Sequence, residues 1–312
     1  MKKFIRKTSF FILPIFVVTL TMEILLRNIP NEYLYKKEYL DKHSNEIETL
    51  IFGSSHSFYG INPAYFSSKT FNIAHISQSL NFDYEILKKY QDNLHNLKTV
   101  ILPISYFTLF NKLENWSESW RVKNYVIYYG MNVSNSLVDY AEVFSNQPKN
   151  NIKRLYDYYC RGNHDQSVTC SKLGWGTSYK SENSLDLVET GKAAAKRHTK
   201  DNIHLEKDKN IFNANKSILN LFAKWAQERK ITLIFITPPA FETYRKNINI
   251  EQLKVTFQTA NKIAIEYDNC FYMNLFSDTS FAGKDFFDAD HLSEIGAEKL
   301  SKLIDKKINE LK

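Results

Sequence analysis

Two short segments of this 312-residue chain carry serine, histidine and aspartate in an arrangement that could do chemistry. The first, residues 49–60, is an apolar run that stops at Gly53 and continues as Ser-Ser-His-Ser. A buried strand followed by glycine and small hydroxyl residues is typical of a tight strand-to-helix turn at the rim of a parallel sheet. Such a turn can expose one hydroxyl as a nucleophile, although an ordinary Gly-Ser turn has the same sequence.

The second segment, residues 286–296, contains an Asp-x-x-His pair just ahead of an amphipathic stretch. A serine nucleophile needs a base to take its proton, and the base needs a carboxylate to hold its ring and tautomer. Ser55, His291 and Asp288 could fill these three roles. Ser54 as nucleophile and Asp290 as the carboxylate are the alternatives that the sequence leaves open.

The order of these blocks resembles that of the SGNH/GDSL hydrolase superfamily, over most of residues 46–110 and 205–312. In that family a Gly-Asp-Ser block follows the first strand and a terminal Asp-x-x-His block supplies the acid and the base. The resemblance implies Ser55 as nucleophile, His291 as base and Asp288 as its partner, with Ser54 standing where the family has Asp. The pattern is most similar to a divergent, membrane-anchored branch associated with cell-envelope polysaccharide modification.

The family's other two blocks, which hold the oxyanion, are altered here. The glycine of the second block is replaced by Ser77 or Gln78, and no Gly-x-Asn-Asp follows the strand expected at 100–104. Ser105 lies about where the asparagine of that third block is expected. One side-chain oxyanion donor, worth about 3 kcal/mol, is therefore missing from the pattern. The residues expected around the oxyanion or substrate are Gly53, Ser77, Gln78 and Ser105.

Apolar runs alternate with stretches of helical spacing in the parts of the chain that flank residues 105–205. This rhythm predicts a three-layer α/β/α sandwich with a five-stranded parallel sheet of the flavodoxin-like type, whose ligands lie beyond the carboxyl ends of the strands. The last helix is expected to begin at Ser293. The strands are expected at 49–52, 70–74, 99–104, 231–236 and 271–275, and three of the helices at 82–97, 211–229 and 253–267.

Residues 105–205 interrupt the rhythm and are expected to be an insertion within one domain that spans 28–312. The first part of the insertion is crowded with tryptophan and tyrosine. These rings could fill the insertion's own core or rest at a membrane interface, and aromatic rings can also stack on sugar faces.

The amino terminus predicts a membrane anchor. Lysine and arginine precede an apolar run at 10–26, which is near the short end of a bilayer span. Positive charge ahead of the run places the amino terminus in the cytoplasm, and the lack of a small-x-small cleavage site favours a retained anchor over a removed signal peptide. The expectation is a single-pass protein of the bacterial inner membrane, with residues 1–27 as its anchor and a periplasmic or extracellular catalytic domain.

Cys160 and Cys170 could form a disulfide in an oxidising compartment, and Cys270 is expected to be a buried thiol. A metal site made of that pair with His164 matches no zinc spacing, so neither a metal nor a cofactor is predicted. Of the other histidines, His56 is expected at the edge of the site and pointing away from Ser55, and His75 is expected to be packed. His164, His198 and His204 are expected to be exposed.

The net charge of +7 is spread along the chain without a basic run, which excludes a nucleic-acid partner. The resemblance and the anchor together imply an esterase or O-acetyltransferase that acts on an acylated envelope polysaccharide or an acyl donor, with envelope-biosynthesis proteins as candidate partners. The alternative is a non-catalytic glycan-binding or assembly component that keeps the same scaffold.

Overall fold

The computed structural model describes residues 1–144, 148–164 and 167–311, which group into two units. We call Met1–Lys37 and Ser117–Thr169 the anchor unit, after the expectation for residues 1–27, and Glu38–Trp116 with Cys170–Lys312 the α/β unit. Of the segment expected as an insertion, residues 117–169 therefore pack with the amino terminus, and the remainder belongs to the α/β unit.

The α/β unit is built on a five-stranded parallel sheet in the order β2-β1-β3-β4-β5. The inner strands β1, β3 and β4 are buried, which explains why they were recognisable as continuous apolar runs. The predicted sheet is confirmed, and each strand begins and ends within two residues of its expected position. The strands are β1 (Thr49–Ile51), β2 (Thr70–Asn72), β3 (Thr99–Pro103), β4 (Thr232–Thr237) and β5 (Cys270–Asn274).

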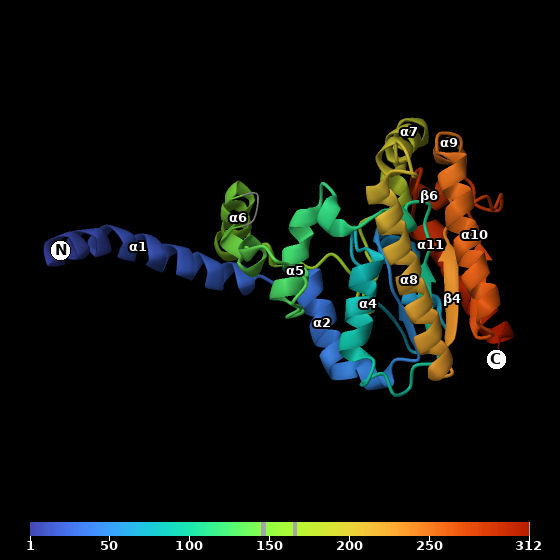
Figure 1. Ribbon diagram of the computed structural model, residues 1–312, viewed down its shortest axis with the longest axis horizontal. Coiled ribbons are helices and arrows are strands. Elements are labelled where there is room, and N and C mark those ends of the chain that lie inside the picture. Colours follow the sequence, from blue (N-terminus) through green and yellow to red (C-terminus); the bar gives the residue numbers. More distant parts are fainter. Residues whose placement is uncertain (145–147, 165–166, 312) are drawn as a thin grey trace. The chain divides into compact units, whose positions relative to one another are not determined.

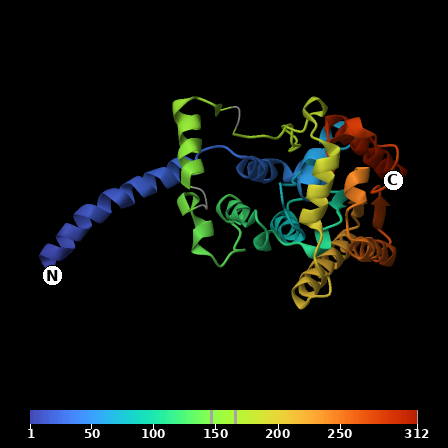
Figure 2. The same cartoon turned by 90° about the horizontal axis from the view of Figure 1, so that it is seen from above.

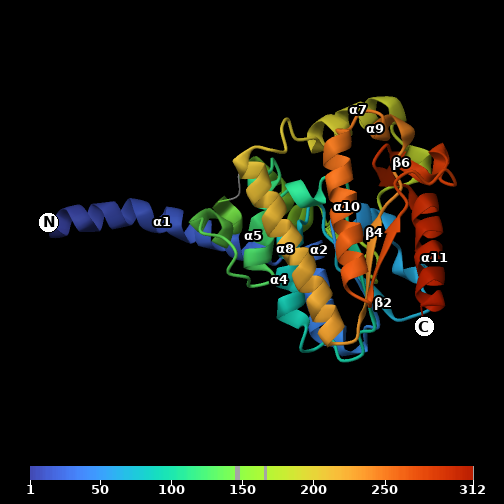
Figure 3. The ribbon, with the colours of Figure 1, turned by 45° about the vertical axis from the view of Figure 1, so that its right-hand side comes forward.

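Helices cover both faces of this sheet, so the three-layer architecture is confirmed (Figures 1 and 3). One layer contains α4 (Leu80–Tyr90), α8 (Glu206–Glu228) and α10 (Ile250–Glu266). On the other face, α11 (Glu294–Glu310) packs against the short helix α3 (Ser55–Gly60). Two further helices, α7 (Leu187–His198) and α9 (Glu242–Arg245), pack against each other.

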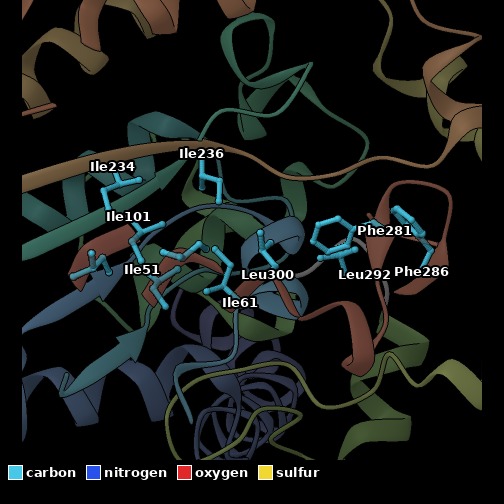
Figure 4. Close-up of a cluster of buried hydrophobic side chains, with 11 residues drawn as sticks. Ile51, Ile61, Ile101, Ile234, Ile236, Phe281, Phe286, Leu292 and Leu300 are labelled. Carbon is cyan, nitrogen blue, oxygen red and sulfur yellow. The ribbon is translucent and has the colours of Figure 1, made fainter. Parts of the chain in front are cut away.

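The core between the sheet and α11 is formed mainly by branched aliphatic side chains (Figure 4). Ile51, Ile101 and Ile234 come from three neighbouring strands and meet Leu300 and Ile304 of α11. The apolar residues of α11 recur at a spacing of three or four, so they form one stripe along the helix. This packing fixes α11, and with it the segment that enters the helix.

That segment is a two-stranded antiparallel hairpin, which was not predicted from the sequence. Strands β6 (Phe286–Asp288) and β7 (His291–Leu292) pair with an irregular register. Ser293 then caps α11 as predicted, its hydroxyl accepting the backbone N–H of Gly296 at 3.4 Å. Asp288 and His291 therefore stand on paired strands immediately before a firmly packed helix.

The anchor unit contains α1 (Lys2–Arg27), α5 (Val122–Ile127) and α6 (Pro148–Leu155), and α1 is a single long helix (Figure 2). The helix α2 (Glu32–His43) contains the boundary between the two units. Residues Lys7–Arg27 of α1 contain an 18-residue window with a mean hydropathy of 2.2, and only 6% of that window is buried. By length and composition this helix could cross a membrane, and a signal sequence would pass the same test.

The three cysteines are all free thiols. The disulfide that the sequence left open for Cys160 and Cys170 is not formed: Cys160 lies exposed on a π-helical turn (η8, Tyr156–Cys160), and Cys170 forms an isolated β-bridge with Gly176. Cys270 is buried as predicted, and burial raises the pKa of its thiol to about 12.

Candidate active site

The turn that presents Ser55 depends on Gly53. This glycine has a φ of +114°, and a Cβ atom built on it would lie 2.0 Å from Cγ of Pro103 in β3. Only glycine fits that conformation and that space. The chain consequently leaves β1, turns sharply, and enters α3 with Ser55 as the first helical residue after Ser54.

The three residues expected to form a catalytic set meet at this turn. Ser55 Oγ lies 2.8 Å from Nε2 of His291. On the other side of the ring, His291 Nδ1 lies 3.0 Å from both carboxylate oxygens of Asp288. Asp288 Oδ1 also accepts the backbone N–H of His291 at 2.8 Å, which holds the carboxylate in place. Of the two candidate serines, Ser55 is the one at hydrogen-bond distance from the imidazole.

A second carboxylate, from Asp290, lies behind the same imidazole. Asp290 is buried, and its Oδ1 is 3.6 Å from Nδ1 of His291. Its Oδ2 lies 3.3 Å from His56 Nε2 and 3.7 Å from His198 Nδ1. Because Asp288 is closer to His291 Nδ1, it is the direct partner of the ring, and Asp290 acts on it from a longer distance.

The two carboxylates control the charge of the histidine. Burial by itself would lower the pKa of His291, but Asp288 and Asp290 outweigh it and raise that pKa to about 9. Burial would raise the pKa of Asp290, yet His291, His56 and His198 hold it well below its usual range. Burial lowers the pKa values of His56 and His198. At neutral pH the cluster therefore contains a buried His291 cation beside the Asp290 carboxylate, flanked by the neutral imidazoles of His56 and His198.

The structure corrects the expectations for two of the other histidines. His56 does not point away from the site, because α3 begins at Ser55 and the chain is helical there. Its ring centroid lies 4.8 Å from that of His291, and its Nδ1 lies 2.6 Å from Oγ of Ser105. His198 is buried rather than exposed, with its Nδ1 2.9 Å from the hydroxyl of Tyr244.

His164 and His204 are exposed and His75 is buried, all as expected. His198 was missed because α7 was assigned to an irregular insertion. A signal was present, since Asp186 caps α7 by accepting the backbone N–H groups of Val188 and Glu189.

The residues expected around the oxyanion lie at this rim, but several of their polar groups have structural partners. The Gly53 N–H donates to Oδ1 of Asp83 at 2.8 Å, and the side-chain amide of Gln78 donates to the same oxygen at 2.6 Å. The hydroxyl of Ser105 is paired with His56. Ser77 has a φ of +61°, a backbone conformation that favours glycine. A small crevice is lined by residues that include Gly53, Ser54, Ser77, Gln78, Pro103 and Trp116.

The role of Asp83 was not predicted from the sequence. Its carboxyl group accepts the backbone N–H of Gly53 and so holds the turn that follows β1. Its side chain is buried on α4, and burial raises its pKa to about 7, although the bonds from Gln78 and the Gly53 N–H oppose the shift. An acidic residue in the first turn of a helix is ordinarily taken as a favourable interaction with the helix dipole, so its sequence position gave no indication of this role.

Aromatic rings enclose the imidazole of His291. Tyr179 is stacked between Tyr59 and Phe287, with ring centroids 3.6 Å and 3.9 Å away. The centroid of Tyr179 lies 5.4 Å from that of His291, with the two rings nearly perpendicular. The backbone N–H of Gly176 donates to the carbonyl of Phe58 in α3. Part of the expected insertion thus forms a wall of the site.

Among the described residues, His56, Asp290 and His291 place ligand atoms within 4.8 Å of one another, close enough to hold a metal ion. The nitrogens that face Asp290 already have carboxylate partners, since His291 Nδ1 contacts Asp288 and His56 Nε2 contacts Asp290 itself.

No family model matches the chain, and no curated protein matches it. Among solved structures, the chain is similar to one from Streptococcus pneumonia that is provisionally described as a platelet activating factor. The two chains are 12% identical, and the match covers 96% of this chain and 99% of that one with a TM-score of 0.44. At that TM-score the likeness carries no argument about fold or function, which therefore rest on the chain's own geometry.

Proposed function

We propose that the chain is a serine-dependent acyl-ester hydrolase or O-acyltransferase. The observation that carries the proposal is the continuous hydrogen-bonded path from the hydroxyl of Ser55 through the imidazole of His291 to the carboxylate of Asp288. Ser55 and His291 are 236 residues apart in the sequence, and the fold brings their polar atoms to hydrogen-bond distance. Nucleophilic acyl transfer uses this arrangement.

In the proposed reaction, Oγ of Ser55 attacks the carbonyl carbon of an ester while Nε2 of neutral His291 takes the hydroxyl proton. The tetrahedral intermediate collapses when His291 returns that proton to the departing alcohol, leaving the acyl group on Ser55. Water, or a second alcohol such as a sugar hydroxyl, then attacks the acyl-enzyme with the same base. Asp288 keeps the proton of His291 on Nδ1, so that Nε2 faces the serine.

The substrate class we propose is an O-acylated polysaccharide of the cell envelope or its precursor. Two features support it: the apolar helix α1, which is long enough to cross a membrane, and the resemblance of the Gly-Ser-Ser and Asp-x-x-His blocks to a membrane-anchored branch of the SGNH hydrolases. With the amino terminus in the cytoplasm, the α/β unit would lie outside the cytoplasm, where such polymers are modified.

The test is hydrolysis of p-nitrophenyl acetate by the full chain reconstituted in phosphatidylcholine nanodiscs. We expect release of p-nitrophenol that is lost in Ser55→Ala and retained in Ser54→Ala, since only Ser55 reaches the base. Addition of an oligosaccharide with a search for a mass gain of one acetyl group would distinguish transfer from hydrolysis. Equal rates in wild type and Ser55→Ala would overturn the proposal.

A specific observation favours a second candidate, a non-catalytic glycan-binding component. The Gly53 N–H and the Gln78 side chain, two groups expected near the oxyanion, are bonded to Asp83. If neither hydrolysis nor acetyl transfer depends on Ser55 while the protein still binds oligosaccharide, this second function replaces the first.

A further inference from the structure

The anchor unit contains a cavity that the proposed chemistry does not use. Its volume is about 420 Å³, within the size range of small-molecule sites. Its wall comes from the chain just after α1, from α5 and the turn before it, and from α6 and the π-helical turn that follows. All of its lining residues belong to the anchor unit, and none belongs to the proposed catalytic set.

The charged residues of the wall do not select an anion. Its cations are already paired within the unit. Arg121 Nε lies 2.8 Å from Glu118, and Lys123 and Arg154 both contact Oε2 of Glu142, at 2.5 Å and 2.9 Å. Two further acids, Glu32 and Asp157, line the cavity itself, and Asp157 lies 3.5 Å from Arg161, so four carboxylates face four cations in and around the wall.

The remaining lining side chains combine aromatic rings with amides. Trp120 and Tyr158 offer partly exposed rings, and Asn124, Asn150 and Asn163 carry both hydrogen-bond donors and acceptors. Aromatic faces pack against the apolar C–H faces of a sugar ring, and amides and carboxylates bond to its hydroxyl groups. A wall whose charges balance, and whose amides can both donate and accept hydrogen bonds, suits an uncharged polyhydroxylated ligand.

We infer that this cavity is a binding site for a neutral sugar residue, separate from the serine site. The sugar could belong to a soluble glycan or to the head group of a glycolipid, since the cavity is lined by Ile29 and Pro30, directly after the apolar helix ends at Arg27. The recognition chemistry is the same for both sources. The inference goes beyond the proposed function and does not depend on Ser55.

The experiment is calorimetric titration of the full chain in phosphatidylcholine nanodiscs, which avoid sugar-based detergents. The soluble probes are maltotetraose, cellotetraose and tri-N-acetylchitotriose. A second arm compares nanodiscs with and without glucosyl-diacylglycerol. A soluble probe that binds equally in both kinds of nanodisc indicates a free glycan, whereas a probe whose binding is weakened by the glycolipid indicates a lipid-borne sugar.

Two variants and a matched control locate the site. We expect Trp120→Ala and Tyr158→Ala each to weaken binding about tenfold, because each loses one stacking face. Tyr156→Ala removes an exposed tyrosine from the same π-helical turn that does not line the cavity, and should bind as wild type does. If Trp120→Ala fails to fold, the comparison of Tyr158→Ala with Tyr156→Ala still tests whether the sugar binds in this cavity.

The outcomes separate this site from the catalytic proposal. Ser55→Ala should bind sugars unchanged, and Trp120→Ala should keep its rate on p-nitrophenyl acetate. The inference is overturned if none of the sugar probes binds, if binding is equal in wild type and Trp120→Ala, or if inorganic phosphate occupies the cavity in preference to them.

Discussion

At the scale of single residues, the two carboxylates around His291 decide the pH at which the proposed base is available. Because the pKa of His291 is raised to about 9, its Nε2 carries a proton at neutral pH, and kcat/KM should rise with pH to a plateau above about 9. Replacing Asp290 with Asn removes one negative charge near the ring, so the rise should shift to lower pH by about one to three units. A pH profile on p-nitrophenyl acetate, corrected with Ser55→Ala, measures both effects.

Asp288→Asn is the comparison that separates orientation from charge. It also removes a negative charge, but it disturbs the bond that sets the tautomer of His291, so its plateau rate should fall about 10⁴-fold. Asp290→Asn should keep most of its plateau. An unchanged pH profile in Asp290→Asn would show that the second carboxylate does not act on the base.

The raised pKa of Asp83 predicts a pH dependence of stability that is independent of catalysis. Its pKa is about 7 in the folded protein and 3.8 in the unfolded chain, so the folded state holds a proton that the unfolded state releases. The free energy of unfolding should therefore decrease as pH rises from about 4 to 7. Asp83→Asn, whose amide oxygen can still accept the Gly53 N–H, should remove this part of the decrease.

Urea unfolding at pH 5 and pH 8 gives the decrease in the free energy of unfolding between these two pH values. This decrease should be larger in the wild type than in Asp83→Asn. Asp92→Asn, at an exposed carboxylate, is the control and should show the same decrease as the wild type. A decrease of the same size in Asp83→Asn would contradict the assignment.

At the scale of elements, the entry into α11 sets the position of the hairpin that carries His291, the proposed base. A Cβ atom on Gly296 would lie 2.0 Å from the backbone oxygen of Asp285, just before β6. Gly296→Ala must therefore push α11 and the hairpin apart, and we expect it to lower the free energy of unfolding by about 1–3 kcal/mol and to reduce esterase activity. Gly60→Ala in α3 is the matched control, because its Cβ would meet only Leu292, at an ordinary 3.7 Å.

Thermal unfolding and the rate on p-nitrophenyl acetate, measured on both variants, give the two readouts. If Gly296→Ala unfolds and reacts as Gly60→Ala does, the contact between α11 and the hairpin does not position His291.

The elements that the sequence predicted well are those with a simple period. The inner strands are buried on both faces, and continuous apolar runs predicted them to within two residues. The hairpin escaped prediction because β6 and β7 are only 3 and 2 residues long, too short to show an alternating pattern. The order of blocks was enough to predict that Ser55, Asp288 and His291 lie together. The positions of His56 and His198 depend on tertiary packing that no local pattern records.

At the scale of the whole molecule, the carboxyl end of α1 is built into the anchor unit. The Glu23 carboxylate accepts the backbone N–H groups of Glu142 and Val143, at 3.1 Å and 2.9 Å. Arg27 donates to the carbonyl of Tyr140 at 2.7 Å. Removal of α1 as a signal peptide would leave these backbone groups without their partners, at a cost of about 1–3 kcal/mol for each group that stays buried.

We therefore predict that α1 is retained in the mature protein. Protein purified from membranes should have an intact mass that includes residues 1–27, and it should stay in the membrane fraction after carbonate extraction. Glu23→Ala should destabilise the anchor unit, whereas Thr19→Ala, which loses only a bond to the carbonyl of Ile15 within α1, should not. A mature chain that begins after Arg27 and still binds sugar at the anchor-unit cavity would show that these contacts are dispensable, and that the apolar helix serves export rather than anchoring.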